Sequence, residues 1–399
     1  MKWFNNWFNH KNFKFSNLFI ILIISMISVF SIKFLYINNN FNSNLKLKIY
    51  KFFYKKYQRI FNNDLKTRFN KQDLDLAIAN ARNQSWVIEQ IKADLKPFIQ
   101  QGLSEKAINQ LYINLASNIS LKYHVVKFKI KNHKITSEYI DDDIQYFRSY
   151  KTLYSMIKIL NEYRLIPDCT FIVYLNDYLN YIPKDIKKPI PVFSFAKDTE
   201  IPIENTTILI PDWMNLYYWD VLRGRINFAK KIYPWNKKEA FIHWRGAGND
   251  SMQHRQKLVE LRDKLKFLDV GMTSGANRVA FLEPEFSLKY KYQVALDGAR
   301  CAWERVVWQM YSNCLMIKPK STQVQWFYRG LKENYNYFSI EDVNQSHLTE
   351  AYKWLIDNDQ QVQQIIKHAN DFANTNFKTQ DFFAYYVLLL EEYAKLMRD

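Results

Sequence analysis

The sequence predicts an α/β fold with a parallel sheet, and two stretches in the second half of the chain carry this prediction. Residues 292–296 have a strand pattern, and a turn at Asp297 and Gly298 leads to a helix pattern over 299–311 and a strand pattern over 314–317. This order is a βαβ unit, in which the two strands run parallel. Residues 241–244 are another strand pattern, followed by a glycine-containing turn and a helix pattern. A chain of 399 residues with 48% hydrophobic content is long enough for two domains of ordinary size.

An apolar segment near the N-terminus predicts a single transmembrane helix. Residues 15–32 carry no charge and are mostly Ile, Leu, Phe, Val and Met, and the apolar run continues past Lys33. We expect a basic tail at 1–16 and a membrane anchor at 17–37. A cleaved signal peptide is the alternative, but the segment runs into three asparagines instead of a small-x-small exit, which favours an uncleaved anchor.

The region after the anchor, 38–70, is expected to form a basic stalk on the membrane. No acidic residue occurs before Asp64, and apolar residues lie at helical spacing between Lys46, Lys48, Lys51, Lys55, Lys56 and Arg59. This pattern favours an amphipathic helix on an anionic membrane surface, with a flexible basic linker as the alternative. The densest basic run abuts a membrane span. We therefore interpret much of the net charge of +17 as serving to bind anionic lipid, and we expect no nucleic-acid partner.

The same basic residues predict the orientation of the chain. The cluster after the span outweighs Lys2, Lys11 and Lys14 before it, so the positive-inside rule places the remainder of the chain in the cytoplasm. Three cysteines are too few and too oddly numbered for a disulfide framework, which agrees with a reducing compartment. A placement facing the secretory lumen is the alternative.

The first half of the chain predicts helices followed by a strand-rich region. Two helices, a hairpin within 123–140 and a further helix precede the clearest strand pattern, 171–175, and more strands are expected within 189–195 and 206–211. Asp177 follows the strand at 171–175, where the carboxyl end of a parallel strand would face a cleft, although an Asx-type turn is the alternative. The acidic triplet at 141–143 precedes a helix, so we interpret it as a capping sequence and not as a metal site.

Arg245 and Arg255 flank the glycine-containing turn after the strand at 241–244. The small residue Gly246 permits close approach of a phosphate, Ser251 is a plausible helix N-cap, and free N–H groups at a helix start favour an anion. A guanidinium group can bind two phosphate oxygens at once. The stretch is therefore a candidate diphosphate site, and an ordinary loop with two surface arginines is the alternative.

Several motifs occur in consecutive order along the chain, namely PIPVFSFAKD, ILIPDW, YPWNKKEAFIHWRG, WRGAGNDSMQHR, KYKYQVALDG, AWER and QWFYRGL. Together they resemble glycosyltransferase family 90, which includes lipopolysaccharide-modifying transferases and the protein O-glucosyltransferases of animals. The resemblance implies two Rossmann-like lobes with a cleft between them, the GT-B arrangement, and inverting sugar transfer from a nucleotide diphosphate donor. It also implies an acceptor lobe at 71–236, a nucleotide-sugar lobe at 237–377 and a terminal helix at 378–399 that crosses back to the first lobe.

The resemblance also assigns roles to individual residues. Asp177 is the expected general base, Asp212 and Trp213 are expected on the acceptor side, and the expected donor-binding residues are Arg245, Gly246, Arg255, Asp297, Gly298 and Arg305. Two residues depart from the family pattern, because Arg305 lies one position later after the DG turn and Glu304 stands where a small polar residue is more familiar. No cofactor and no metal are expected.

The expected function is that of a membrane-anchored glycosyltransferase. It would move a hexose from a nucleotide diphosphate sugar, with UDP as the expected nucleotide, to a hydroxyl of a lipopolysaccharide core or similar glycan. Its expected partners are the nucleotide sugar, a glycan or lipid-linked glycan acceptor and the anionic membrane surface. A protein O-glycosyltransferase and a non-catalytic protein that binds the donor or a glycan are the alternatives.

Overall fold

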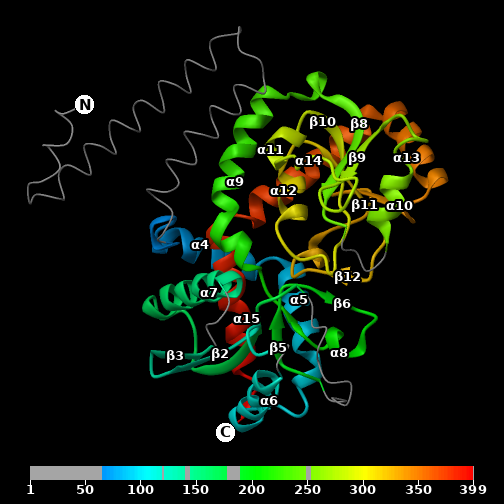
Figure 1. Cartoon of the computed structure of the whole chain (residues 1–399). Coiled ribbons are helices and arrows are strands. Elements are labelled where there is room, and N and C mark those ends of the chain that lie inside the picture. The colour runs from blue at the N-terminus through cyan, green and yellow to red at the C-terminus, as the bar shows by residue number, and fades with distance from the viewer. Residues whose placement is uncertain (1–64, 119–120, 140–143, 178–188, 249–252, 399) are drawn as a thin grey trace, which may run out of the picture. The chain divides into compact units, whose positions relative to one another are not determined.

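A computed structural model describes residues 65–118, 121–139, 144–177, 189–248 and 253–398. The predicted basic tail, the predicted anchor at 17–37 and nearly all of the predicted stalk lie outside these residues. Within the described ranges, no helix is both long enough and apolar enough to cross a membrane. Residues Asp64–Asp399 form one compact unit that contains two five-stranded sheets (Figure 1).

The first sheet has the strand order β3-β2-β4-β5-β7 and is mixed. β2 pairs antiparallel with β3 and with β4, whereas β4, β5 and β7 are parallel. In chain order its strands are β2 (Val125–Lys131), β3 (Lys134–Glu138), β4 (Cys169–Tyr174), β5 (Val192–Ser194) and β7 (Ile208–Leu209). All residues of β4 are buried, as expected for a central strand whose sequence is almost wholly apolar.

The second sheet has the order β13-β11-β10-β8-β9, and all its strand pairs are parallel. The predicted βαβ unit is confirmed, because β10 pairs with β11 and α12 lies between them in the chain. The elements are β8 (Glu239–Gly246), β9 (Leu268–Met272), β10 (Tyr290–Val294), α12 (Arg305–Tyr311), β11 (Leu315–Pro319) and β13 (Phe338–Ile340).

Two helices of the second half are shorter than the sequence predicts. α12 begins at Arg305 and not at 299, because Arg300 is held by an ion pair and Trp303 has a left-handed backbone with a φ of 78°. α10 (His254–Glu260) ends before Leu261, and its N-cap position is Gln253. The predicted N-cap Ser251 lies outside the described residues.

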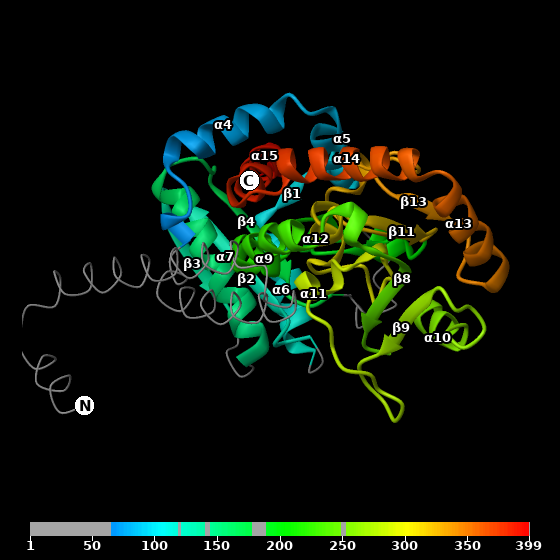
Figure 2. The same cartoon turned by 90° about the horizontal axis from the view of Figure 1, so that it is seen from above.

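Helices surround both sheets and connect them (Figure 2). In the first half they are α4 (Lys71–Arg82), α5 (Ser85–Leu95), α6 (Glu105–Ser117), α7 (Ile144–Glu162) and α8 (Pro202–Asn205). α9 (Trp213–Ile232) leads from the first sheet to the second. The others are α11 (Pro284–Ser287), α13 (Gln345–Asp357), α14 (Asp359–Asn376) and α15 (Thr379–Ala394).

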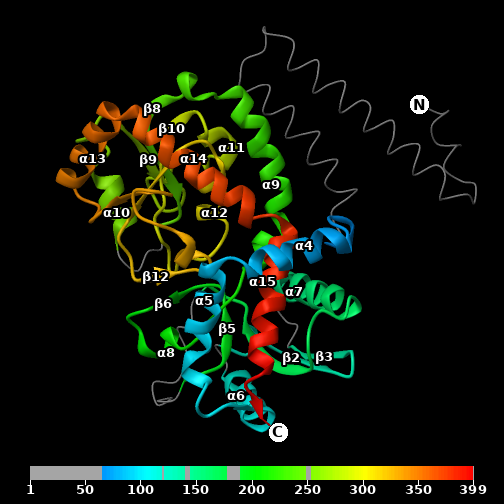
Figure 3. The same cartoon turned by 180° about the vertical axis from the view of Figure 1, so that it is seen from behind.

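The last helix, α15, packs against the first half of the chain (Figure 3). The Tyr393 hydroxyl donates to the carbonyl of Thr170 in β4, at 3.1 Å, and the Tyr386 hydroxyl donates to the carbonyl of Pro211, at 2.8 Å. The chain then ends as β14 (Met397–Arg398), parallel to β1 (Leu103–Ser104). The two halves are also joined by an antiparallel pair of β6 (Lys197–Asp198) and β12 (Gln323–Val324).

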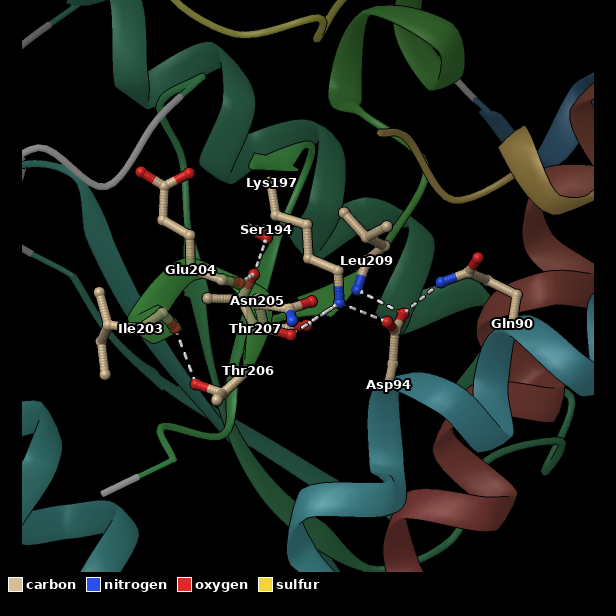
Figure 4. Close-up of polar contacts among 10 residues, drawn as sticks. All are labelled: Gln90, Asp94, Ser194, Lys197, Ile203, Glu204, Asn205, Thr206, Thr207 and Leu209. Atoms are coloured by element: carbon tan, nitrogen blue, oxygen red, sulfur yellow. Dashed lines mark hydrogen bonds and ion pairs between the residues drawn. The ribbon is translucent and has the colours of Figure 1, made fainter. Parts of the chain in front are cut away.

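A buried ion pair fastens α5 to β6, and the carboxylate of that pair also bonds to β7 of the first sheet (Figure 4). Lys197 donates to Asp94 at 2.6 Å and to the carbonyls of Asn205 and Thr207 at 3.1 and 2.9 Å, which uses all three ammonium protons. The second oxygen of Asp94 accepts from Gln90 and from the backbone N–H of Leu209. Since every partner comes from the protein, this cluster is a structural clamp.

Candidate active site

A cavity of about 430 Å³ brings together residues from both halves of the compact unit. Asp177 and Tyr218 line it from the first half, and most other lining residues follow the carboxyl ends of β8 and β10. Parallel α/β sheets bind their ligands at this edge, because loops and helix starts converge there. The cavity is therefore the candidate active site.

Arg255 lies against the loop that follows β10. Its Nε donates to the carbonyl of Asp297 at 2.9 Å, and its Nη1 donates to the carbonyl of Ala247 at 2.8 Å. The guanidinium also lies 5.7 Å from the ring of Trp244. These contacts fix the guanidinium at the cavity wall and bring together the two stretches that the sequence singles out.

Arg305 is the first residue of α12 and also lines the cavity. Its Nη2 donates to the carbonyl of Arg245 at 2.8 Å, and among the described residues no carboxylate lies within ion-pair distance of its guanidinium. Burial and the neighbouring charge of Arg255 lower the pKa of Arg305 to about 10. Two guanidinium groups that repel each other in a cavity favour the binding of an anion between them.

Arg245 lines the same cavity but is largely engaged by the protein. Its guanidinium forms an ion pair with Asp269 and donates to the carbonyls of Asp269 and Trp244 at 2.7 and 3.0 Å. Burial would raise the pKa of Asp269, but the nearby imidazole of His243 and hydrogen bonds from Tyr290 and Arg245 hold it well below its usual value. An anionic ligand would therefore compete with the carboxylate of Asp269 for Arg245. At Arg305 it would meet no such competition.

The loop residues Asp297 and Gly298 line the cavity beside Arg255. The carboxylate of Asp297 lies 3.5 Å from the ammonium of Lys318, so its charge is neutralised within the protein. A Cβ on Gly298 would lie 2.8 Å from Nη2 of Arg255, so a side chain at this position would displace that guanidinium. Gly246 is buried at the end of β8, where a Cβ would lie 2.6 Å from the Trp244 ring, and it does not line the cavity.

Asp177 is half-buried and lies just after the carboxyl end of β4. Its backbone N–H donates to the side-chain oxygen of Asn176 at 2.8 Å, which fixes the turn after the strand. The same cavity also contains Glu304, and burial raises the pKa of that carboxyl. Four carboxyl groups thus line the cavity together with its arginines, those of Asp177, Glu283, Asp297 and Glu304, and Asp177 is the one that the first half of the chain supplies.

The structure places Asp212 and Trp213 behind the cavity and not in its lining. Asp212 is buried as the N-cap of α9, where it accepts from the backbone N–H and the side chain of Asn215 at 2.9 and 2.6 Å. Burial raises the pKa of Asp212 to about 7. Trp213 is buried against the ring of Trp303, and an acceptor-side role for both residues stays a prediction.

The sequence does not predict several of the residues that line the cavity. Arg300 forms a buried ion pair with Glu204 of the first half, and Glu204 also accepts the backbone N–H of Asp198. Trp303 lines the cavity with its left-handed backbone, and Tyr218 projects from α9. The pairing of Arg300 with Glu204 joins residues 96 positions apart, and no local pattern reports such a contact.

The described residues contain no group of three or more His, Cys, Asp or Glu side chains arranged to hold a metal ion. The acidic triplet at 141–143 lies outside the described residues. The expectation of transfer without a metal therefore stays a prediction.

An arginine-rich cavity at the carboxyl ends of parallel strands is typical of α/β enzymes that bind phosphorylated ligands. Comparison with known sequences then defines the class. The chain belongs to glycosyl transferase family 90, whose model matches residues 81–399, and it is therefore a glycosyltransferase. The resemblance inferred from the sequence motifs is confirmed.

Two related proteins illustrate the match. Protein O-glucosyltransferase 2 of Danio rerio is 24% identical over 326 residues, which cover 77% of this chain and 62% of that protein. Protein O-glucosyltransferase 1 of Rattus norvegicus is 24% identical over 336 residues, which cover 77% of this chain and 79% of that protein. The chain thus spans less than two thirds of the Danio protein.

Two solved structures give weaker matches. The structure of Anabaena HepE in complex with UDP and glucose has a TM-score of 0.33, with 14% identity, and covers 51% of this chain and 62% of that one. A glycosyltransferase from Rickettsia africae has a TM-score of 0.38, with 10% identity, and covers 65% of this chain and 85% of that one. Both TM-scores are below 0.5.

Proposed function

We propose that this protein is an O-glucosyltransferase of the GT-B type that transfers glucose from UDP-glucose to a hydroxyl group of a protein. The observation that carries the proposal is the single cavity that Asp177, Arg255 and Arg305 line together. The related proteins are named protein O-glucosyltransferases, which favours a protein acceptor over the lipopolysaccharide acceptor expected from the sequence.

In this proposal the arginines bind the diphosphate of the donor. Arg255 and Arg305 neutralise the negative charge that grows on the diphosphate as the glycosidic bond breaks, and this stabilises the transition state. Arg245 supports them from its ion pair with Asp269. Because cationic side chains supply this neutralisation, no metal ion is required for the departure of the diphosphate.

Asp177 is proposed as the general base. An inverting transfer needs the acceptor hydroxyl to attack the anomeric carbon from the face opposite the diphosphate, and a carboxylate can take the proton of that hydroxyl as the new bond forms. Asp177 lines the cavity from the first half of the chain, whereas the arginines line it from the second. The donor and the acceptor would thus be held by different halves.

A lipopolysaccharide or lipid-linked glycan is the second candidate acceptor. It is favoured by the basic and apolar sequence of the predicted stalk, which would hold the enzyme at an anionic membrane surface. The same sequence supports a proposed location as a single-pass membrane protein whose catalytic part faces the cytoplasm.

The test is an acceptor comparison with the full chain and a panel of nucleotide sugars in excess chelator. Release of UDP and the mass of each acceptor are measured with a folded, serine-bearing protein domain and with a lipopolysaccharide core. The proposal predicts UDP release from UDP-glucose and a single hexose added to the protein domain. Addition of hexose to lipopolysaccharide alone would show that the acceptor is a lipopolysaccharide and not a protein. UDP release that only Mn²⁺ restores would contradict the metal-independent mechanism.

A further inference from the structure

A second cavity, of about 520 Å³, lies in the second half of the described chain. The loop before β13, the strand itself, α13 and α14 enclose it, and it shares no lining residue with the candidate active site. Figure 2 shows α13 and α14 beside β13. We refer to this site as the aromatic cavity, because Tyr335, Phe338 and Trp354 line it.

The rings of the aromatic cavity form two pairs. Tyr335 stacks on the imidazole of His368, with ring centres 3.8 Å apart and an angle of 16° between the planes. Phe338 and Trp354 lie 5.0 Å apart at 31°. Tyr335 is 48% exposed and Trp354 is 36% exposed. Since one face of Tyr335 is covered by His368, solvent reaches the opposite face, which offers an aromatic platform with a polar edge.

The polar part of the aromatic cavity consists of neutral groups. Asn334, Gln361 and Gln364 contribute amides, each of which can both donate and accept hydrogen bonds. No Asp, Glu, Lys or Arg lines the cavity, although 24% of the residues of the chain are charged. Hydroxyl groups also donate and accept, so this lining suits a ligand rich in hydroxyls. A phosphate or sulfate would find no countercharge here.

The walls of the aromatic cavity are held by the protein itself. Asn336 is buried, and its side chain accepts from the backbone N–H of Lys332 at 2.9 Å and donates to the carbonyl of His368 at 3.5 Å. The backbone N–H of Ser339 donates to the side chain of Asn334 at 3.1 Å. A ligand would thus meet a formed site and would not have to order the loop.

We propose that the aromatic cavity is a binding site for a neutral oligosaccharide. The CH faces of a pyranose ring would lie on Tyr335 and Trp354, and its hydroxyl groups would bond to the amides of Asn334, Gln361 and Gln364. A site of this size and lining, apolar with a few convergent polar groups, matches the general form of small-ligand sites. The proposal is independent of the identity of the donor bound at the candidate active site.

The test is a binding measurement with the full chain, purified without sugar-headed detergents. Maltotetraose, cellotetraose and tetra-N-acetylchitotetraose are titrated by calorimetry and by saturation-transfer NMR, with a sulfated heparin tetrasaccharide and phenol as the charged and non-sugar comparisons. Tyr335→Ala and Trp354→Ala remove the two exposed rings. Ile356→Ala is the matched control, because Ile356 is 46% exposed on the same helix as Trp354 and does not line the cavity.

The proposal predicts that at least one neutral oligosaccharide binds, and that Tyr335→Ala and Trp354→Ala each raise its Kd by about tenfold or more. Ile356→Ala should leave the Kd unchanged, and UDP affinity should be the same in all variants. Absence of binding by every neutral oligosaccharide, binding of phenol or the sulfated sugar alone, or an equal loss in Ile356→Ala would overturn it. An oligosaccharide that binds to a chain unable to use any nucleotide sugar would contradict the proposed function while supporting this site.

Discussion

At the scale of single residues, anion binding in the candidate active site depends on which charged side chains are already paired within the protein. Arg245 is paired with Asp269, and Asp297 is paired with Lys318, so both charges are balanced within the protein. Arg305 has no carboxylate within ion-pair distance among the described residues, and burial together with the charge of its neighbour Arg255 lowers its pKa. We therefore expect Arg305 and Arg255 to contribute more to anion binding than Arg245 does.

Asp177→Asn tests the general base. The change removes the proton acceptor but keeps the size of the side chain, so transfer should fall by about 10²–10⁴-fold, while UDP affinity should stay at the wild-type value. Turnover is measured by UDP release with a saturating acceptor. Asp168→Asn, the same change just before the amino end of β4, is the control and should have normal turnover. Normal turnover in Asp177→Asn would rule out the assignment.

Asp212 has a consequence for the pH dependence of stability. In the folded state its pKa is raised to about 7, whereas the unfolded chain releases this proton near pH 4, at about the ordinary value for Asp. Between these values the folded state holds more protons, so the free energy of unfolding falls as pH rises from about 4 to about 7 and is unaffected by this group above that.

Asp212→Asn should therefore flatten the pH dependence of the free energy of unfolding between about pH 4 and about pH 7. The measurement is urea unfolding of the full chain at several pH values. Asp381 is a useful comparison, because burial raises its pKa to about 6, and Asp381→Asn should flatten only the part of the curve below about pH 6. An unchanged slope in Asp212→Asn would show that this carboxyl is already ionised at pH 5.

At the scale of elements, the clamp that joins α5 to β6 and β7 illustrates what a buried ion pair contributes. The side chains of Asp94 and Lys197 are 1% and 6% exposed, and removing one partner leaves the other buried and unpaired. Lys197→Met should thus lower the free energy of unfolding by about 3–5 kcal/mol. The double variant Asp94→Asn/Lys197→Met should recover most of that loss.

The comparison of the two clamp variants is made by chemical denaturation of the full chain. It separates the cost of an unpaired charge from the cost of lost packing, because both variants lack the lysine and only the single variant retains a buried carboxylate. Equal stability of the two variants would mean that the ionic contact contributes nothing beyond packing.

The helices and strands also show which parts of the fold local sequence patterns can predict. The βαβ unit of β10, α12 and β11 is predictable, because its strands are apolar and its turn contains Asp297 and Gly298. The start of α12 is not predictable, because it depends on the contact of Arg300 with Glu204 in the other half of the chain. The antiparallel hairpin attached to β4 makes the first sheet mixed, and strand order is likewise a property of long-range pairing.

Local sequence patterns also predict only some of the residues of the candidate active site. Arg245, Arg255 and Asp297 are identifiable, because each adjoins a strand end or a glycine turn in the sequence. Trp303 and Tyr218 are not, since their place in the cavity follows from a left-handed backbone and from the packing of α9. The aromatic cavity is equally hidden, because its rings come from three separate elements.

At the scale of the whole molecule, the predicted anchor and its flanking basic residues predict on which side of the membrane the catalytic part lies. A reporter fused after Asp399 should behave as cytoplasmic, because the basic cluster after residues 17–37 outweighs the one before it. The measurement compares a reporter active only in the cytoplasm with one active only outside it. Activity outside the cytoplasm, or a glycan attached to Asn83 or Asn205, would reverse the orientation.

The central claim is that the cavity lined by Asp177 and the arginines binds a nucleotide diphosphate. The most direct test is calorimetric titration of the full chain with UDP, in the wild type and in Arg255→Ala, Arg305→Ala and Arg262→Ala. Arg262 lies beyond the end of α10, is half-exposed and is paired with Asp263, so it serves as the matched control.

Each lost charge-assisted contact is worth about 1.5–3 kcal/mol. The account therefore predicts that UDP binds the wild type and Arg262→Ala equally well, and that Arg255→Ala and Arg305→Ala each raise its Kd by about 10- to 150-fold. Equal UDP affinity in all four proteins, or no binding to the wild type, would contradict it.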